Sequence, residues 1–344
     1  MPLEPSTVRR ILAVKLSSFG DIVHVTPCLR ALRGAYPEAE ILVAVDRTLA
    51  GVLRHDSHID GLVDANPRLH GFLTGTLSAA ARLAQVGGAR FDVALDFQGL
   101  RRSAAWVYAS RARWRGGRGG RRPGWQMAMR PDPQQHAIDV CAGVAERAGV
   151  PVHDRQPRLY PGASAEREIE ALLGAADVAR SGFIVANPFG IWPAKRWPID
   201  RWAALIRTLS AEWGATIIVT GSRSELTDAA PLLAQAGAAA VSLVGRLTLE
   251  QAICLYHRAA LLISGDSGPL HAAAAVGTPV VALYGPTWPE RTGPRGSPVR
   301  IIQVSRSASP ASYRDPTAQR HMRAIEVERV LAAAAALYHP RAAR

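Results

Sequence analysis

A short polar segment with the sequence GDSG, residues 265–268, interrupts two apolar runs in LLISGDSGPLHAAAAVGTPVVALYG. A glycine permits a sharp turn there, and Pro269 suits the first turn of a helix, where its missing N–H costs nothing. Small residues before that helix leave backbone N–H groups uncovered, so a diphosphate can approach the main chain closely. His271 falls in the same turn, although a helical histidine beside alanines is more often simply packed. The pattern predicts an anion site at residues 265–271.

A second loop combines two cations with the start of a helix. The apolar run Phe183–Ala186 is followed by NPFGIWPAKRW, in which Lys195 and Arg196 come just before a helix begun by Pro198. Cations at a helix N-terminus favour an anion, because the helix dipole and the free N–H groups act in the same direction. A solvated basic loop explains these residues equally well, since Lys-Arg pairs arise easily in an arginine-rich chain.

A third loop, KLSSFGDIVHVTP, carries an isolated carboxylate. We expect the preceding strand to break at Ser17, Gly20 to permit a tight turn and Asp21 to start a helix. On these residues alone Asp21 is best interpreted as a helix N-cap, which stabilises a helix by about 1 kcal/mol. The loop contains no GxGxxG dinucleotide-binding motif.

These loops separate short apolar runs from segments with helical periodicity. The runs, bounded by Gly, Pro, Asn or Asp, are expected to be buried parallel strands at residues 11–16, 41–45, 91–97, 183–186, 216–220, 261–264 and 280–284. Helices are expected at residues 22–35, 103–112, 136–148, 165–173, 201–213, 249–259, 270–276 and 325–337. Strand, loop and helix repeated in this order predict a doubly wound α/β fold.

A Pro-rich polar stretch at residues 150–166 interrupts this alternation and is typical of a linker. We therefore expect two Rossmann-like parallel-sheet domains, residues 1–160 and 161–344, facing each other across a cleft, with the last helix closing the chain. In such sheets ligands bind beyond the carboxyl ends of the strands, which is where all three loops lie.

Composition limits the classes of function. A hydrophobic content of 48% over 344 residues indicates a soluble folded protein, and no signal peptide or membrane-spanning segment is predicted, so we expect a cytoplasmic location. Cys28, Cys141 and Cys254 are widely spaced and are expected to be buried thiols rather than disulfides or zinc ligands. Lys15 and Lys195 are the two lysines among 41 Lys and Arg residues, and the net charge of +13 implies an anionic partner.

Five segments in order along nearly the whole chain resemble the ADP-heptose:lipopolysaccharide heptosyltransferases, glycosyltransferase family 9. They are SSFGDIVHVTPCLRAL, FDVALDFQGLRRSA, QQHA, PAKRWPIDRW and GDSGPLHAAAAVGTPVVALYGPT. The N-terminal segments are most similar to heptosyltransferase I, whereas PAKRWP and DSGPLH are closer to heptosyltransferase II. The first enzyme has a basic cluster after its second strand region, where this chain has only Arg68. Heptosyltransferase II and another GT-B sugar-nucleotide enzyme, such as an epimerase, therefore stay open as alternatives.

The resemblance implies a GT-B fold and an inverting transfer of L-glycero-D-manno-heptose from ADP-heptose to the Kdo-lipid A inner core, without cofactor or metal. It implies that Asp21 is the general base. The donor-binding residues that it implies in the C-terminal domain are Lys195, Asp266, Ser267, Gly268, His271 and Glu225. The acceptor-binding residues that it implies in the N-terminal domain are Ser18, Gly20, Gln98, Gly99, Arg101 and His136.

Residues 101–130 hold nine arginines and no acidic residue, with three interleaved tryptophans. In a transferase this segment would line the mouth of the site for an acidic acceptor or meet the anionic cytoplasmic face of the inner membrane. Part of RWRGGRGGRRPG is expected to be a solvated loop. RGG-like repeats with aromatics also occur in single-stranded nucleic-acid binders. The low aromatic content of 6% and the absence of an RRM, KH or helix-turn-helix signature argue against a nucleic-acid partner.

Overall fold

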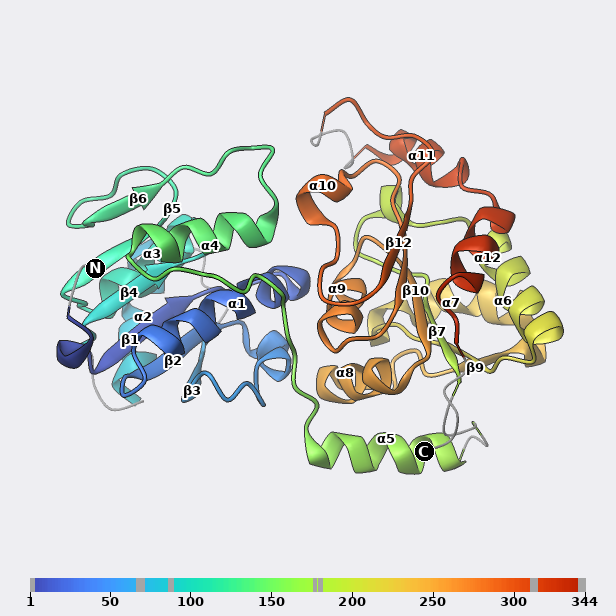
Figure 1. Cartoon of the computed structure of the whole chain (residues 1–344), viewed down its shortest axis with the longest axis horizontal. Coiled ribbons are helices and arrows are strands. Elements are labelled where there is room, and N and C mark those ends of the chain that lie inside the picture. Colours follow the sequence, from blue (N-terminus) through green and yellow to red (C-terminus); the bar gives the residue numbers. More distant parts are fainter. Residues whose placement is uncertain are drawn as a thin grey trace. The chain divides into compact units, whose positions relative to one another are not determined.

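The computed structural model describes residues 4–65, 72–85, 90–175, 178, 182–309 and 315–339, so Arg68 lies outside the described residues. The chain divides into two compact units, Met1–Tyr160 and Pro161–Arg344 (Figure 1). Each unit is built around its own parallel sheet. The order of strands within each sheet changes direction once, as in doubly wound folds.

In the first unit the described strands form a six-stranded parallel sheet in the order β3-β2-β1-β4-β5-β6. Their bounds are β1 Arg10–Val14, β2 Glu40–Val45, β3 Gly61–Asp64, β4 Val93–Asp96, β5 Trp114–Arg118 and β6 Met127–Met129. The central strands are nearly continuous runs of buried Val, Ile, Leu and Ala. Such runs suit a sheet that is covered on both faces.

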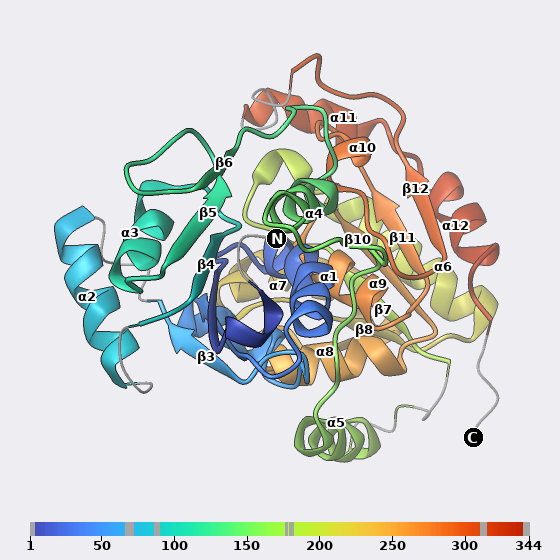
Figure 2. The ribbon, with the colours of Figure 1, turned by 60° about the vertical axis from the view of Figure 1, so that its left-hand side comes forward.

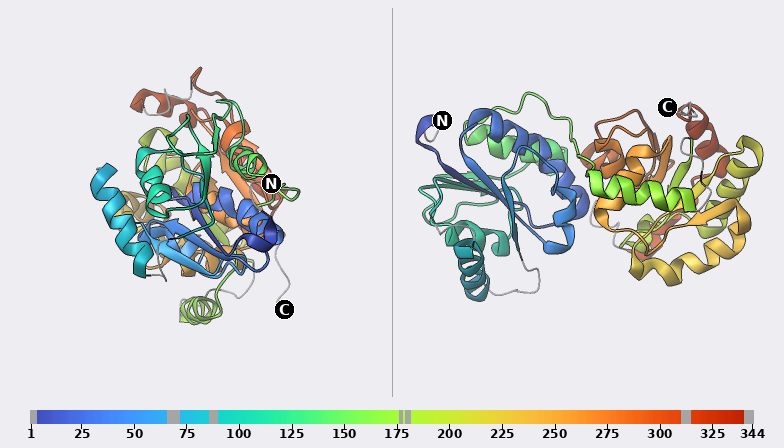
Figure 3. Two further views of the ribbon diagram at one scale, coloured as in Figure 1. Left: turned by 90° about the vertical axis from the view of Figure 1, so that its left-hand side faces the viewer. Right: turned by 90° about the horizontal axis from the view of Figure 1, so that it is seen from below.

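Four described helices cover that sheet: α1 Phe19–Ala35, α2 Phe72–Gln85, α3 Arg101–Ala109 and α4 Ala137–Arg147. Helices α1 and α4 pack together on one face, and α2 and α3 pack together on the other (Figure 2 and Figure 3). Because all strands are parallel, their carboxyl ends meet at one edge, where β1 runs into α1 and β4 runs into α3.

In the second unit the described strands form another six-stranded parallel sheet, in the order β12-β11-β10-β7-β8-β9. Their bounds are β7 Ile184–Asn187, β8 Ile217–Val219, β9 Ala240–Ser242, β10 Leu261–Gly265, β11 Val280–Leu283 and β12 Val299–Ile302. The helices are α5 Ala163–Ala175, α6 Ile199–Trp213, α7 Leu226–Ala236, α8 Leu249–Arg258, α9 Gly268–Ala275, α10 Pro289–Thr292, α11 Arg320–Arg323 and α12 Val327–Ala335. Helix α12 packs on α6, and Tyr338 just beyond it stacks on Trp213.

The predicted α/β class with two parallel-sheet units is confirmed, and a strand or helix occurs at every predicted position. The solvated loop expected in part of residues 113–124 does not include Trp114–Arg118, which forms β5 beside β4. Its glycines allow the close approach, because a Cβ on Gly117 would lie 2.5 Å from the Asp96 carbonyl oxygen. Residues 119–126 that follow form bends and turns.

All three cysteines are free and buried, as predicted. Within the part of the chain that the structure describes, no helix combines the length and the apolar character needed to cross a bilayer.

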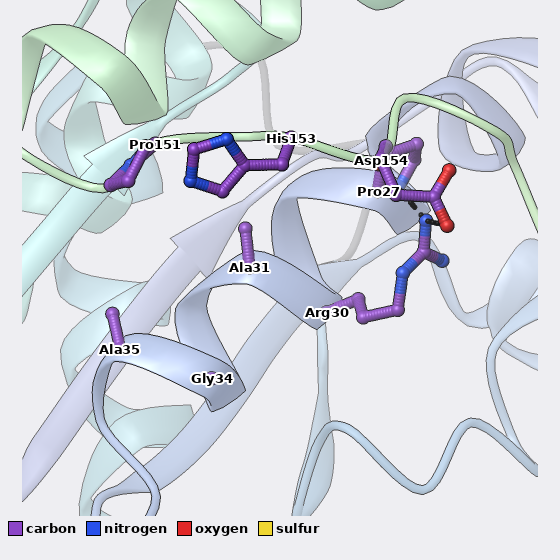
Figure 4. Close-up of a pocket in the computed structure, with 8 residues that line it drawn as sticks. All are labelled: Pro27, Arg30, Ala31, Gly34, Ala35, Pro151, His153 and Asp154. Atoms are coloured by element: carbon purple, nitrogen blue, oxygen red, sulfur yellow. Dashed lines mark hydrogen bonds and ion pairs between the residues drawn. The ribbon is translucent and has the colours of Figure 1, made fainter.

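The predicted linker has no regular structure at residues 150–162. Residues 154–158 of this segment are hydrogen-bonded to α1 of the first unit. Arg30 of α1 donates hydrogen bonds to the carbonyl oxygens of Asp154 (3.0 Å) and Gln156 (2.9 Å). The Arg158 N–H donates to Thr26 Oγ1 (3.2 Å). A mostly apolar cavity of about 340 Å³ lies between α1 and this segment (Figure 4). The cavity contains none of the residues that the sequence places in a site.

Candidate functional site

The loop after β1 places Asp21 in the first turn of α1 rather than at its cap. The helix begins at Phe19, so Ser18 is the N-cap and Asp21 is the third helical residue. The Ser18 N–H and Oγ–H both donate to Asp21 Oδ2, at 3.1 and 2.9 Å. The interpretation of Asp21 as the N-cap is therefore wrong, because a capping box uses the serine as cap and the acid as its return partner. Gly20 is a buried helical residue and makes no turn.

Asp21 is an ionised carboxylate that solvent can reach. Its Oδ1 lies 3.3 Å from Nζ of Lys15, whose side chain is 1% exposed, whereas the Asp21 side chain is 38% exposed. Burial alone would raise the pKa of Asp21, but the charge of Lys15 and the hydrogen bonds from Ser18 outweigh it and lower this pKa to about 2. The loop thus presents a negative charge at neutral pH at the carboxyl edge of the first sheet.

The loop after β4 lies directly beside the loop after β1. Gln98 Oε1 accepts a hydrogen bond from the Ser17 N–H (3.2 Å). Gly99 has a φ of +82°, and a Cβ there would lie 3.1 Å from the Arg118 carbonyl oxygen, so only glycine fits without strain. The structure therefore brings Gln98 to the segment that holds Asp21, whereas Gly99 packs against Arg118 at the end of β5.

Arg101 and His136 occupy helix starts in the same unit. Arg101 is the exposed first residue of α3, and Arg102 beside it donates to Ser17 Oγ (3.1 Å). His136 is the buried N-cap of α4, where its Nδ1 accepts from the Ile138 N–H (3.2 Å). Its ring lies edge-on to that of His24, one turn after Asp21, at 6.0 Å between centroids.

In the second unit the segment after β10 is built around a buried carboxylate. Asp266 Oδ2 lies 2.7 Å from Lys195 Nζ, and its Oδ1 lies 3.7 Å from His271 Nε2 and 3.4 Å from the Tyr284 hydroxyl. Burial alone would raise the pKa of Asp266, but the Lys195 charge and the contact with His271 hold it well below its usual range.

The main chain beside this carboxylate begins a helix as predicted. Helix α9 starts at Gly268, with Ser267 as its N-cap and Pro269 in its first turn. Ser267 Oγ lies 3.0 Å from Ser264 Oγ, and residues 267–269 are half-buried. The first N–H groups of α9 have no partner within the helix, so the segment can receive an anion.

The two cations of the loop after β7 have different partners. Lys195 contacts Asp266, which explains how a carboxylate is accommodated in a segment suited to anions. Arg196 instead pairs with Asp228 (2.7 Å) and donates to the Gly190 carbonyl oxygen (2.8 Å). The structure therefore joins Lys195, and not Arg196, to the segment after β10.

Glu225 lies in the connection from β8 to α7, at the same edge of the second sheet. Its Oε2 accepts from the Ser222 N–H (2.7 Å) and Oγ–H (2.9 Å). Its described contacts are thus those of a capping box, and none joins it to Lys195 or Asp266.

Sequence reasoning missed Lys15, Arg102 and Tyr284 as members of these sites. The rarity of lysine was a signal for Lys15, and the position of Tyr284 directly after a buried strand was a signal for its role. Arg102 carried no signal in an arginine-rich segment. Among the described residues no three His, Cys, Asp or Glu side chains gather in the manner of a metal site.

Residues 80–321 match glycosyltransferase family 9 (heptosyltransferase), which is more than half of the chain, and the chain belongs to this family. Lipopolysaccharide heptosyltransferase 2 of Salmonella typhimurium is 28% identical over 86% of this chain and 88% of its own length. Lipopolysaccharide heptosyltransferase 1 of the same organism is 26% identical over 83% of this chain and 92% of its own length.

The structure of the Escherichia coli ADP-heptose heptosyltransferase II superposes with a TM-score of 0.77 at 22% identity. The superposition covers 96% of this chain and 98% of the Escherichia coli chain. The GT-B fold expected from the sequence is confirmed by this likeness.

Proposed function

We propose that this family 9 glycosyltransferase transfers heptose from ADP-heptose to Kdo-lipid A in lipopolysaccharide core synthesis, as a heptosyltransferase I. The observation that carries the chemistry is Asp21, an ionised and solvent-accessible carboxylate fixed by Lys15 and Ser18. The N-terminal unit would bind the acceptor and the C-terminal unit the sugar nucleotide. The relatives of type 1 and type 2 are similarly distant, so addition of the second heptose is the alternative.

The reaction would be a single displacement with inversion. Asp21 accepts the proton of an acceptor hydroxyl, the hydroxyl oxygen bonds to the anomeric carbon of the heptose, and the bond from that carbon to the ADP oxygen breaks. Because the pKa of Asp21 is about 2, we expect the proton to move late, when the attacking oxygen has become acidic.

The departing diphosphate gains negative charge, which groups of the second unit would stabilise. The N–H groups at Ser267 and Gly268 begin α9, and the cation of Lys195 lies beside them on Asp266. In this arrangement Asp266 orients Lys195, and His271 supports Asp266 from its other oxygen. Glu225 would contact the ribose from the neighbouring loop.

The acceptor carries carboxylates and phosphates, which suits the arginines of residues 101–130. Arg122 lies over the Trp125 ring (5.2 Å) and Arg115 over the Tyr108 ring (5.9 Å), so aromatic faces hold two of these cations. We propose that this surface receives the acceptor at the cytoplasmic face of the inner membrane, where the enzyme would bind peripherally. Gln98, Gly99, Arg101 and His136 would line the acceptor site.

The test offers ADP-heptose with either Kdo-lipid A or its monoheptosylated form and identifies the product by mass spectrometry. We expect one heptose on Kdo-lipid A. Heptose on the second acceptor alone would make the protein a heptosyltransferase II, and transfer to neither acceptor would refute the proposal.

Replacement of Lys15 by Met is expected to raise the pKa of Asp21, because burial would no longer be opposed by the lysine charge. Since only the ionised form accepts a proton, the acidic limb of the kcat/KM profile should move to higher pH. Profiles measured from about pH 4 to pH 8 would show the shift, with Lys15→Arg as the charge-preserving control. A profile unchanged in Lys15→Met would contradict this role of Lys15.

A further inference from the structure

Asp96 is a fully buried carboxylate at the end of β4 that reaches no solvent and belongs to none of the site residues described above. Its Oδ1 accepts the N–H groups of Gln98 and Gly99, both at 2.9 Å, and its Oδ2 accepts Ser103 Oγ–H at 2.8 Å. Burial raises the pKa of Asp96 to about 6 in spite of these bonds, so the charge is held at a cost to stability. This cost suggests that the carboxylate has a role other than stabilising the fold.

The strand register places Asp96 beside the loop that carries Asp21. Val14, the last residue of β1, pairs with Asp96 in the parallel ladder, and the Phe97 N–H donates to the Val14 carbonyl oxygen (3.0 Å). Strands β1 and β4 then end at the same edge of the sheet, so the turn after Asp96 lies alongside Ser17.

Two side chains hydrogen-bond to Ser17 from residues that Asp96 holds directly or through a neighbour. Gln98, whose N–H is bound by Asp96, accepts the Ser17 N–H through Oε1 (3.2 Å). Arg102, next to the Asp96-bound Ser103, donates to Ser17 Oγ (3.1 Å). Ser17 precedes Ser18, which holds the Asp21 carboxylate by two hydrogen bonds.

We propose that Asp96 is a positioning residue for Asp21, acting through the Gln98 turn and the start of α3 on Ser17 and Ser18. This inference rests on the proposed function for its effect on catalysis, but the hydrogen-bond relay itself is independent of it. A shift of the loop by about 1 Å would misalign the base and lower the rate about 100-fold.

The experiment compares Asp96→Ala with Asp96→Asn. In the asparagine variant Oδ1 can still accept both N–H groups. Its Nδ2–H can donate to Ser103 Oγ, because the Ser103 hydroxyl hydrogen can turn from Asp96 to the Leu100 carbonyl oxygen, which lies 2.8 Å away. We expect kcat to fall about 100-fold in Asp96→Ala with an unchanged KM for ADP-heptose, and to stay within about threefold in Asp96→Asn.

Hydrogen exchange at the Ser17 amide gives a readout that does not depend on turnover. It should become faster in Asp96→Ala and in Gln98→Leu, and stay slow in Asp96→Asn and in Gln98→Glu, which keeps an acceptor oxygen. If Asp96→Ala does not fold, the comparison of Gln98→Leu with Gln98→Glu still tests the relay through Ser17. Asp56→Ala is the matched control, because Asp56 is another buried acid, hydrogen-bonded to His58, whose loss should leave kcat unchanged.

Normal kcat in Asp96→Ala, equal losses in the Ala and Asn variants, or unchanged Ser17 exchange in the Ala and Gln98→Leu variants would each overturn the proposal. A wild-type protein that transfers no heptose would refute the proposed function instead, and the exchange measurements would still decide on the relay.

Discussion

Asp21→Asn is expected to lower kcat about 10³-fold, because the amide cannot accept the proton of the acceptor hydroxyl. The fold of the loop should persist, since the Asn oxygen can still accept the Ser18 N–H and Oγ–H. Affinity for ADP should be unchanged, because the proposed nucleotide site lies in the second unit. Steady-state kinetics measures the fall in kcat, and calorimetric titration measures the affinity for ADP.

One side effect of that variant needs its own control. Asp21→Asn leaves the buried Lys15 ammonium without its carboxylate, and an unpaired buried charge can perturb the loop. The double variant Lys15→Met with Asp21→Asn removes that charge. If the double variant is as slow as the single one, the rate loss belongs to the missing base. A single variant with a near-normal rate would show that Asp21 serves only as the capping-box partner of Ser18.

Lys195→Met is expected to weaken ADP binding about 10- to 100-fold, as estimated for loss of a charge-assisted hydrogen bond. It also leaves the buried Asp266 carboxylate without its cation, which would destabilise the fold by about 3–5 kcal/mol. The two effects need separate measurements, by calorimetric titration with ADP and by denaturant unfolding.

The pH dependence of unfolding identifies the source of this destabilisation. In the wild type the pKa of Asp266 is lower in the folded than in the unfolded chain, so its stabilising contribution is present at neutral pH and is lost in acid. Without Lys195, burial raises the pKa of Asp266, so the variant should be relatively more stable in mild acid than at neutral pH.

The double variant Lys195→Met with Asp266→Asn separates stability from binding. It removes both charges, so most of the lost stability should return, whereas ADP binding should stay weak. Normal ADP affinity in either variant would contradict a role of Lys195 in the donor site. Unchanged stability in the single variant would contradict its role as the partner of Asp266.

The sequence predicted the fold well where strands are continuously buried. The runs that became β1, β7 and β10 consist almost wholly of buried apolar residues, which mark central strands of a parallel sheet. The strand β5 was missed because its sequence, WRGGR, lacks that pattern. Gly117 serves close contact with Asp96 across the sheet, a requirement that no local periodicity reveals.

The sequence selected candidate site residues but not the contacts among them. Motif resemblance selected Asp21, Lys195 and Asp266, whereas propensity alone made Asp21 an N-cap. That Lys195 meets Asp266, 71 positions further along the chain, depends on β7 and β10 being neighbours in the sheet. Such a pairing is set by strand order, which composition and periodicity do not encode.

The attachment of the linker to α1 has a mechanical consequence. Arg30 and Thr26 hold residues 154–158 to the first unit, and the ring centroids of Tyr160 and His58 of that unit lie 5.9 Å apart. Cys254 Sγ contacts the Gly162 carbonyl oxygen in the second unit (3.8 Å). Pro161, with its ring-restricted φ, is therefore left between two fixed ends. The linker torsions that neither set of contacts restrains are concentrated around this residue, and a substitution here is expected to change the flexibility of the linker while leaving both sheets intact.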